Sequence, residues 1–487
     1  MTLPRIYISA AHKSSGKTTL SLGLCAALTR LGHSIQPLKK GPDYIDPLWL
    51  GAASQAICYN LDFNTMSNDE ILHMLESKST GKNMTLIEGN MGLYDGTDLK
   101  GTNSNASMAK LTHTPVILVI DAQGVTRGVA PLLLGYASFD PDIHIAGVIF
   151  NKVAGDRHEQ KLIAVTEHYS DIPVLGCVRR SSDLILVERH LGLMPYNESN
   201  KASAKIELIA DRVENQVDIE KILLISKQAP ELPKYQSSPT LNSTTSATKT
   251  ATQSDTKTAT PSDRITIGIC RDESFGFYYA DDLEALTSAG AELITINTLR
   301  DNELPMIDAL FIGGGFPETQ MHALSKNTSM RKSIYNAIES GMPVYAECGG
   351  LMYLSESISW GEDSCEMVGI IPATTMMADT PKGRGYVELR ETDNMKWPND
   401  SSARHIAAHE FHYSRLEDKQ GQLTQKGTFA YAVERGYGID GEHDGWLYKN
   451  LLASYSHMRD TSKYHWAKRF VRFIKNTKET KQHDHSY

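Results

Sequence analysis

Short apolar runs rich in β-branched residues alternate along the chain with longer segments of helical periodicity. In the first half these runs lie at residues 5–10, 85–88, 116–121 and 145–151, and helical patterns such as that of residues 18–31 lie between them. Continuous apolar strands that alternate with helices are typical of parallel sheets covered by helices on both faces. The first half is therefore predicted to be an α/β domain with a parallel sheet.

The second half repeats this alternation. Its apolar runs lie at residues 265–270, 292–297, 309–313 and 344–347, again with helical patterns between them. The same argument predicts a second α/β domain.

A change of composition separates the two halves. Residues 226–263 are rich in Ser, Thr, Lys, Gln and Pro, and residues 241–261 contain almost no large apolar side chain. Such a segment cannot bury enough apolar surface to offset the entropy lost on ordering, so we predict a flexible linker. The predicted domains are residues 1–225 and 264–478.

Composition narrows the class of protein. A chain of 487 residues is too long for one typical core, and 40% hydrophobic with 22% charged residues is typical of globular proteins. The net charge of −9 argues against general nucleic-acid binding. No apolar run is long enough to span a bilayer, and the N-terminus lacks the layout of a signal peptide. The six cysteines have no metal-type spacing, so we expect a reduced, cytoplasmic protein.

The loop after the first predicted strand carries a phosphate-binding pattern. A strand, a glycine-containing loop and a helix that begins near Lys17 turn backbone amides toward phosphates. In this pattern the lysine reaches the β- and γ-phosphates of ATP, and Thr18 binds Mg2+. Ala11 stands where the full pattern has its first glycine. The residues predicted to bind ATP are Ser14, Ser15, Gly16, Lys17, Thr18 and Thr19.

Carboxylates follow two further strand-like stretches of the first half. Residues 41–47 read Gly-Pro-Asp-Tyr-Ile-Asp-Pro and contain Asp43 and Asp46, and Glu88 ends a buried strand. Ligands bind at the carboxyl ends of parallel strands, and carboxylates are ligands that Mg2+ prefers. The sequence therefore predicts a metal site that includes Asp46 and Glu88, although each carboxylate alone could equally be a solvated loop charge.

The second half carries a candidate nucleophile. Cys348 follows the predicted strand 344–347, and the two glycines after it permit a sharp turn into a helix. A helix N-terminus favours the thiolate form of a cysteine. An earlier glycine-rich turn contains Gly314 and Gly315, whose backbone amides could stabilise an oxyanion. A thiol nucleophile needs a base, and histidines in residues 408–414 and 453–457 are candidates.

Taken in order, these segments resemble the cobyrinic acid a,c-diamide synthase family, glutamine-dependent tetrapyrrole amidases with sirohaem amidase-like relatives. The most specific stretches are residues 41–47, 88–96, 104–111 and 188–193, and the resemblance covers nearly the whole chain apart from the linker and the tail. It implies an N-terminal P-loop domain similar to dethiobiotin synthetase and a C-terminal domain similar to class I glutamine amidotransferases.

The resemblance also implies roles for individual residues. Lys17, Thr18, Asp46 and Glu88 would handle ATP and Mg2+, while Arg189 and His190 could meet substrate carboxylates or be structural. Asn105 stands where the family has a threonine after its serine. The residues expected near the substrate are Asp43, Tyr44, Asp95 and Ser104.

In the amidotransferase domain the resemblance favours His457, in a late Tyr-x-His segment, as the base for Cys348. His409 and His412 would support the site or the domain interface. A full triad would place a carboxylate two residues after the histidine, but Arg459 stands there, so the sequence identifies no third member.

The implied reaction is amidation of the a and c acetate carboxylates of cobyrinic acid, in cobalamin biosynthesis, with ATP, Mg2+ and glutamine. Sirohaem or another modified tetrapyrrole is an alternative substrate, since two features suggest a divergent subgroup: the unusual loop of residues 10–15 and the arginine at position 459. A nucleotide switch with a degenerate amidase domain is the alternative from another class, which Cys348, His457 and the absence of a signature lysine at position 12 disfavour. Whether the protein is a monomer or a homodimer stays open.

Overall fold

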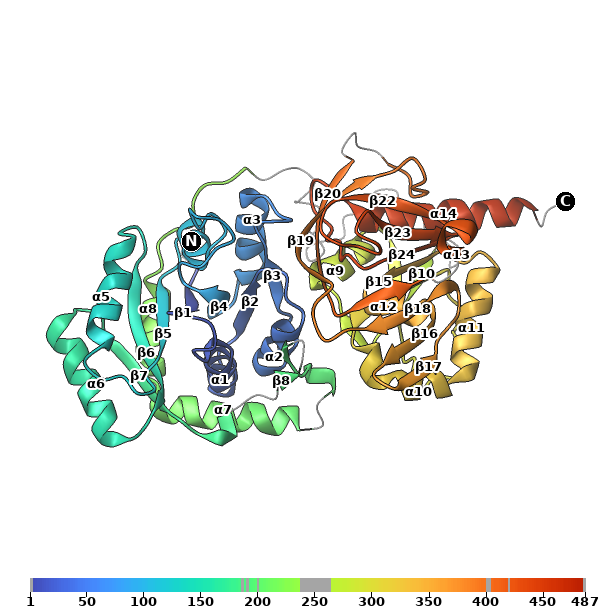
Figure 1. Cartoon of the computed structure of the whole chain (residues 1–487). Helices are drawn as coiled ribbons and strands as arrows, with labels where there is room; N and C mark the ends of the chain where they lie inside the picture. The colour runs from blue at the N-terminus through green and yellow to red at the C-terminus, as the bar shows by residue number, and fades with distance from the viewer. Residues whose placement is uncertain are drawn as a thin grey trace. The chain divides into compact units, whose positions relative to one another are not determined.

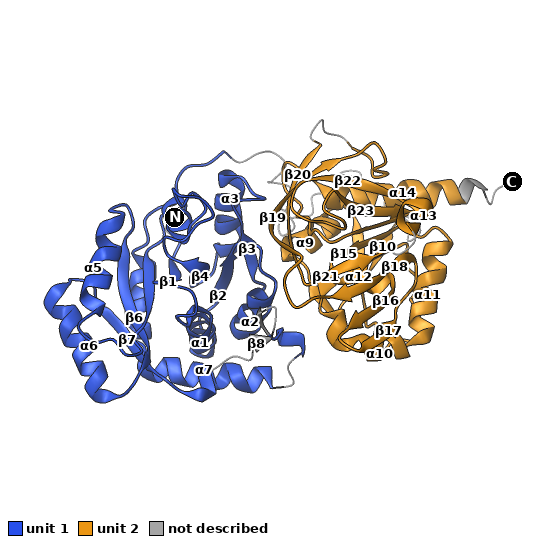
Figure 2. Ribbon diagram, viewed as in Figure 1, with its two compact units in different colours: residues 1–245 blue, residues 246–487 orange. Residues whose placement is uncertain are grey.

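A computed structural model describes most of the chain as two compact units, residues 1–245 and 246–487 (Figure 2). Each unit contains its own large β-sheet (Figure 1). Within the described part of the chain, no helix combines the length and the apolar character needed to cross a membrane. The described residues are 3–184, 188–189, 192–198, 201–236, 264–399, 404–418 and 421–484.

The sheet of unit 1 has seven parallel strands in the order β3-β2-β4-β1-β5-β6-β7. The apolar strands predicted in the first half are all present, which confirms the α/β class of this unit. The bounds are β1 Arg5–Ala10, β2 Ile35–Lys40, β3 Tyr59–Leu61, β4 Met84–Gly92, β5 Val116–Asp121, β6 Ile145–Val153 and β7 Val174–Arg179.

Helices cover this sheet, and four of them share one apolar core with it. Residues of α1, α2, α7 and α8 form a single cluster with side chains of the central strands, including Leu24, Ile206 and Ile222. The bounds are α1 Lys17–Arg30, α2 Ile45–Ser54, α3 Asn68–Ser79, α4 Asn105–Leu111, α5 Val129–Phe139, α6 Asp156–Tyr169, α7 Ala202–Gln216 and α8 Ile219–Lys227.

Short elements precede α7 in unit 1. A two-stranded ladder of β8 (Glu188–Arg189) and β9 (Gly192–Leu193) lies between 3-10 turns at Ser182–Leu184 and Tyr196–Glu198. This ladder comes from the stretch 188–193 that carried the family resemblance. His190 and the side chain of Arg189 lie outside the described residues.

The predicted linker, residues 226–263, is described only as far as residue 236. That part lies against unit 1: the Arg5 guanidinium donates a hydrogen bond to the Pro230 carbonyl at 2.5 Å, and the Tyr235 hydroxyl donates one to Glu76. These two residues of the predicted linker therefore contact unit 1. Residues 237–263 lie outside the described part.

The large sheet of unit 2 is mixed and has nine strands in the order β12-β10-β13-β15-β24-β23-β22-β19-β20. The first five run parallel, and the strands from β23 onward are antiparallel. The bounds are β10 Ile265–Cys270, β12 Ala291–Ile296, β13 Ala309–Ile312, β15 Val344–Glu347, β19 Gly383–Glu391, β20 His405–His412, β22 Thr428–Arg435, β23 His443–Tyr448 and β24 Leu451–Ser454.

The remaining elements of unit 2 surround this sheet. A second sheet has the order β17-β16-β18-β21, and a short pair joins β11 to β14. The strand bounds are β11 Phe275–Phe277, β14 Gly314–Gly315, β16 Ser355–Trp360, β17 Asp363–Glu366, β18 Ile371–Met377 and β21 Ser414–Glu417. The helix bounds are α9 Ala280–Ser288, α10 Met321–Lys326, α11 Thr328–Glu339, α12 Gly349–Leu354, α13 Gln422–Lys426 and α14 Trp466–Asp484, with a 3-10 turn at Pro317–Gln320.

An aromatic cluster fixes α14 against the parallel strands of unit 2. Tyr345 of β15 stacks on Phe311 of β13 with ring centroids 5.1 Å apart, and it also contacts Trp466 and Phe470 of α14. Aromatic pairs of this kind add to the stabilisation from burial alone. The cluster fixes the strand that leads directly into Cys348.

Candidate active sites

The phosphate loop of unit 1 joins the end of β1 to the start of α1. Gly16 has a φ of +93°, and a Cβ at this position would lie 2.0 Å from the Asn151 amide nitrogen. The position therefore requires glycine both for its backbone and for space. The Ser15 hydroxyl donates to the His12 carbonyl at 2.8 Å, which closes the loop. Thr19 lies in the first turn of α1.

Two residues at the end of β6 hold this loop in place, and the sequence did not single them out. Asn151 Nδ2 donates to the Ser15 carbonyl at 2.9 Å, and Lys152 Nζ donates to the Ser14 carbonyl at 3.1 Å. Lys152 also pairs with Asp121 at the end of β5 at 2.6 Å. The dipeptide Asn-Lys at the end of a strand is not a recognisable motif. The sequence therefore does not indicate that these side chains contact the loop after β1.

The three residues predicted to bind Mg2+ converge beside the phosphate loop. The Thr18 hydroxyl lies 2.9 Å from Glu88 Oε1 and 3.4 Å from Asp46 Oδ2. They come from α1, β4 and α2, which meet at the carboxyl edge of the sheet. Glu88 is fully buried, and its Oε2 has no hydrogen-bond partner among the described residues.

Lys39, which the sequence interpretation passed over, lies among these carboxylates. Its Nζ lies 2.5 Å from Asp46 Oδ2, 2.8 Å from Glu88 Oε1 and 3.8 Å from Asp43 Oδ2. The side chain is 2% exposed, so the ammonium depends on these carboxylates for its stabilisation. Burial lowers the pKa of Lys39, but Asp46 and Glu88 outweigh burial and hold the pKa well above its usual value.

The same cluster sets the charge of its neighbours. Burial and the Lys39 ammonium lower the pKa of Lys17 to about 8. Burial opposes ionisation of Asp46, yet Lys39 holds the pKa of that carboxyl below its usual value. Burial and the nearby Asp46 raise the pKa of Asp43 to about 7, and burial also raises the pKa of Glu88. The site therefore concentrates both signs of charge where phosphates would bind.

The residues predicted to meet the substrate lie around this cluster and already have structural partners. Asp43 Oδ1 accepts the backbone amides of Ile45 and Asp46 at 2.9 and 3.0 Å, which starts α2. Tyr44 is buried at the same turn. Asp95 Oδ2 accepts the Gly92 amide at 3.0 Å.

The predicted substrate residue Ser104 is the N-cap of α4. Its hydroxyl accepts the Ser107 amide at 3.1 Å, so this side chain is engaged in the described structure. Asn105, the departure from the family pattern, is fully buried. Its amide donates to the Met91 and Gly92 carbonyls, each at 3.0 Å, and thus ties α4 to the end of β4.

Cys348 of unit 2 lies on a strained turn between β15 and α12. Its φ and ψ are 47° and −101°, a conformation that non-glycine residues rarely adopt. A Cβ on Gly350 would lie 2.2 Å from the Ile312 carbonyl oxygen, so the turn fits only with glycine there. This strand–cysteine–helix arrangement resembles the elbow that presents a nucleophile at the edge of a sheet.

The structure brings His457 to Cys348, with which it forms a hydrogen bond. Its Nδ1 lies 3.3 Å from Oε2 of Glu347, the residue that directly precedes the cysteine. Burial lowers the pKa of His457, but the bonds to Cys348 and Glu347 outweigh burial and raise it to about 10. Glu347 was not predicted, because the sequence pattern placed a third member after the histidine.

Of the two other histidines considered, one touches the site directly. The ring of His409 stacks on that of His457, and burial together with the charge of His457 holds the pKa of His409 well below its usual value. His412 instead stacks on Tyr455, and its Nδ1 lies 2.8 Å from the Ser414 carbonyl oxygen.

The glycine-rich turn of β14 lies beside His457 and beside the glycines that follow Cys348. A Cβ on Gly314 would lie 2.6 Å from His457 Cε1, and a Cβ on Gly349 would lie 3.0 Å from the Gly315 amide nitrogen. The predicted oxyanion residues Gly314 and Gly315 thus lie next to the elbow and the imidazole. Any side chain at position 314 would displace the histidine.

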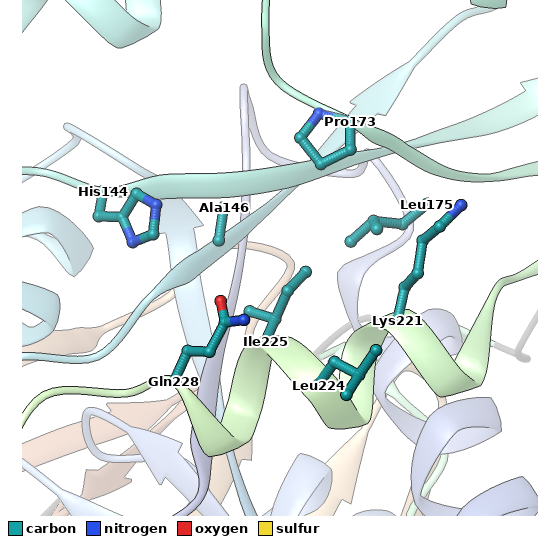
Figure 3. A pocket seen from close by; sticks show the side chains of 8 residues that line it. All are labelled: His144, Ala146, Pro173, Leu175, Lys221, Leu224, Ile225 and Gln228. Atoms are coloured by element: carbon teal, nitrogen blue, oxygen red, sulfur yellow. The ribbon is translucent and has the colours of Figure 1, made fainter.

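A separate cavity of about 240 Å3 lies in unit 1 (Figure 3). His144 and Pro173 directly precede β6 and β7, so this cavity is at the amino ends of the strands, whereas the phosphate loop is at their carboxyl ends. It contains none of the predicted site residues. Its lining residues are His144, Ala146, Pro173, Leu175, Lys221, Leu224, Ile225 and Gln228.

The phosphate loop of unit 1 and the cysteine elbow of unit 2 define the class, a glutamine amidotransferase joined to a nucleotide-binding domain. Family models agree: residues 7–193 match the CobQ/CobB/MinD/ParA nucleotide binding domain, and residues 266–463 match the CobB/CobQ-like glutamine amidotransferase domain. Near full-length relatives specify the family. The chain belongs to the cobyrinate a,c-diamide synthase family, a group of glutamine-dependent amidotransferase ligases.

Three relatives illustrate the match. A cobyrinate a,c-diamide synthase of Magnetococcus marinus is 40% identical over 471 residues, which covers 97% of each chain. Those of Archaeoglobus fulgidus and Methanosarcina acetivorans are each 39% identical, and the matches cover 97% and 94% of this chain and 98% and 92% of the relatives. The family expected from the sequence is confirmed.

Proposed function

We propose that this protein amidates the a and c acetate carboxylates of cobyrinic acid, with glutamine as nitrogen donor and ATP as the source of activation. The observation that carries the proposal is a cysteine elbow with a bonded histidine in a chain that also holds a phosphate loop. A carboxylate is a poor electrophile, so an enzyme that makes an amide from it needs both ammonia and activation. The relatives are cobyrinate a,c-diamide synthases, which supports cobyrinic acid as the substrate.

Unit 2 would release ammonia from glutamine. Cys348 Sγ attacks the side-chain amide carbon, and the amides around Gly314 and Gly315 stabilise the oxyanion. His457, whose pKa the contacts to Cys348 and Glu347 raise before the attack, gives a proton to the departing ammonia. Water then attacks the glutamyl thioester, and glutamate and the free thiol are formed.

Unit 1 would use the ammonia. A substrate carboxylate oxygen attacks the γ-phosphorus of ATP, ADP leaves, and an acyl phosphate forms. Ammonia then attacks the acyl carbon, phosphate leaves, and the nitrogen loses a proton to give the primary amide. Lys17 would supply the positive charge that phosphoryl transfer needs.

The residues beside the phosphate loop fit Mg2+. Thr18, Asp46 and Glu88 would hold the ion, and the unpartnered Glu88 Oε2 is an oxygen ready to accept it. The described residues contain no cluster of three or more His, Cys, Asp or Glu arranged for a metal. Mg2+ characteristically needs just one or two carboxylates together with substrate phosphates. When bound, the ion neutralises charge that develops on the phosphates.

Substrate recognition would fall to the residues around this cluster. Asp43, Tyr44 and Asp95 lie on the loops after β2 and β4, at the carboxyl edge where ligands of such sheets bind. Ser104 would contribute its position at the start of α4, since its hydroxyl already caps the helix. We place the enzyme in the cytoplasm, which suits the free cysteines of the described residues.

A substrate comparison tests the proposal. The purified protein is incubated with ATP, Mg2+ and glutamine, and with cobyrinic acid, hydrogenobyrinic acid or sirohaem, and product masses are measured. Two acid-to-amide exchanges on cobyrinic acid are expected. Exchange on sirohaem alone would keep the reaction but reject the substrate, and no exchange on any of the three would reject the proposed function.

A further inference from the structure

We propose that Glu347 is the third member of the glutaminase site, a positioning residue that fixes the tautomer and orientation of His457. This inference rests on the glutaminase half of the proposed function. The sequence pattern expects this role at position 459, two residues after the histidine. The structure gives it instead to the residue directly before Cys348.

The contacts of Glu347 are those of a fixed acceptor. Its Oε2 lies 3.3 Å from His457 Nδ1, while its Oε1 accepts the Met458 amide at 3.0 Å and the Tyr345 hydroxyl. The glutamate side chain is 4% exposed and the histidine side chain 3% exposed. A buried carboxylate that already has two donors on one oxygen cannot swing away from the imidazole.

Arg459, at the position where the sequence pattern expects the third member, contacts residues other than His457. Arg459 Nε donates to Asp281 Oδ2 at 2.9 Å, and its guanidinium lies over the Tyr279 ring, 4.7 Å from the centroid. The next residue, Asp460, donates its amide to Asp282 at 2.7 Å. The chain after His457 therefore turns toward α9, and Arg459 has its own carboxylate there.

The strand geometry explains why a residue next to the cysteine can reach the histidine. Alternation along β15 puts Tyr345 and Glu347 on one face, so the tyrosine hydroxyl bonds the carboxylate. Glu347 pairs with Ser454 of β24, and His457 follows three residues later. The positive φ of Cys348 breaks the alternation immediately afterwards and turns the thiol toward the same imidazole.

The chemical consequence concerns which of its two ring protons the charged imidazole gives up. A carboxylate accepts from Nδ1–H, which leaves Nε2 to exchange a proton with Cys348. Two other residues contact the ring away from Nδ1. His409 stacks on its face at a centroid distance of 4.9 Å, and Gly314 packs on its edge.

The test replaces the carboxylate by its neutral isostere. In Glu347→Gln the amide can donate to Nδ1 and favour the wrong tautomer, so the glutaminase kcat should fall about 100- to 10,000-fold with little change in the KM for glutamine. Amidation with free ammonia should stay within about twofold of wild type, which shows that unit 1 and the proposed amidation survive. Glu391→Gln is the control, because Glu391 is also buried and accepts a tyrosine hydroxyl, from Tyr464 at 2.8 Å.

A glutaminase kcat within about threefold of wild type in Glu347→Gln would overturn the inference, whereas wild type without glutaminase activity would instead defeat the proposed function. If Glu347→Gln leaves only part of the molecules with unit 2 folded, Glu347→Asp decides, since it keeps the charge on a shorter arm. A folded Asp variant at least tenfold more active per folded molecule than the Gln variant supports the inference, and equal activities contradict it.

Discussion

The imidazole of His409 lies flat against that of His457, with ring centroids 4.9 Å apart and an interplanar angle of 14°. The two residues also bridge their backbones, with amide-to-carbonyl distances of 3.2 and 2.8 Å. Since the pKa of His409 is held well below its usual value, His409 is neutral and stacks on the charged ring without repelling it. The imidazole of His457 is thus held on its face as well as at its Nδ1.

We expect His409→Ala to lower the glutaminase kcat about fivefold, because an aromatic contact contributes about 1 kcal/mol. His409→Phe keeps a flat ring and should stay within about threefold of wild type. Steady-state rates of glutamate release measure both variants. Equal losses in Ala and Phe would show that stacking is not what the ring provides.

Lys39 should be essential for stability in the absence of Mg2+. Lys39→Met leaves Asp46 and Glu88 buried without their cation, a change that costs about 3–5 kcal/mol in comparable buried pairs. Bound Mg2+ would supply the missing positive charge beside the two carboxylates. Added MgCl2 should therefore raise the melting temperature of Lys39→Met more than that of wild type. Thermal unfolding with and without MgCl2 measures this difference.

The control for Lys39 is Lys110→Met, which removes a lysine 39% exposed and paired with Asp140 at 2.7 Å. An exposed pair contributes little, so this variant should melt near wild type with the same response to MgCl2. If Lys39→Met and wild type gain equally from MgCl2, the assignment of this carboxylate pair to the metal is contradicted.

Asn151 should act on ATP binding and not on glutamine hydrolysis. Its hydrogen bond to the Ser15 carbonyl holds the phosphate loop, so Asn151→Ala should raise the KM for ATP about tenfold, the loss of roughly 1.4 kcal/mol. The control Asn215→Ala removes an asparagine that donates to the Asp211 carbonyl on the exposed face of α7. An unchanged KM in Asn151→Ala would show that the loop keeps its shape without this contact.

The raised pKa of His457 predicts a pH dependence of unit 2. A histidine whose folded pKa of about 10 exceeds its unfolded value contributes stability that is fully present below about pH 6.5 and is lost as the pH rises toward 10. His457→Asn should therefore lose less unfolding free energy than wild type over that range. Tryptophan fluorescence during denaturation measures the unfolding free energy of unit 2, because every tryptophan except Trp49 belongs to that unit.

His405→Asn serves as the control for this pH effect. His405 lies 2.9 Å from Glu434, but its side chain is 71% exposed. Its loss should therefore leave the change of unfolding free energy with pH near that of wild type. Parallel slopes for wild type and His457→Asn between pH 6.5 and 10 would contradict the charge assigned to the histidine.

The first and last residues of several strands were predicted correctly, because turn-forming residues stand at both ends of a continuous apolar run. The observed bounds of β1, β5, β10 and β15 equal those predicted. The antiparallel strands of unit 2 were not predicted. β19, for example, alternates buried with exposed positions and includes exposed charges such as Glu388 and Arg390, so no continuous apolar run marks it.

The site residues likewise fall into those that the sequence identifies and those that it does not. Cys348 and the phosphate loop have local signatures in which the spacing itself carries the chemistry. Glu347 and Lys39 have none, since each acts through partners brought to it by neighbouring strands: His457 follows β24, and Glu88 belongs to β4. Their roles become visible once the strand order is known.

The division of labour between the two sites is tested most directly with Cys348→Ser, assayed for amidation of cobyrinic acid with either glutamine or ammonium chloride as the nitrogen source. The account predicts that product mass shows no exchange with glutamine but two acid-to-amide exchanges with ammonium, at a rate near that of wild type. Loss of both reactions in a variant that melts like wild type would contradict it, as would undiminished use of glutamine.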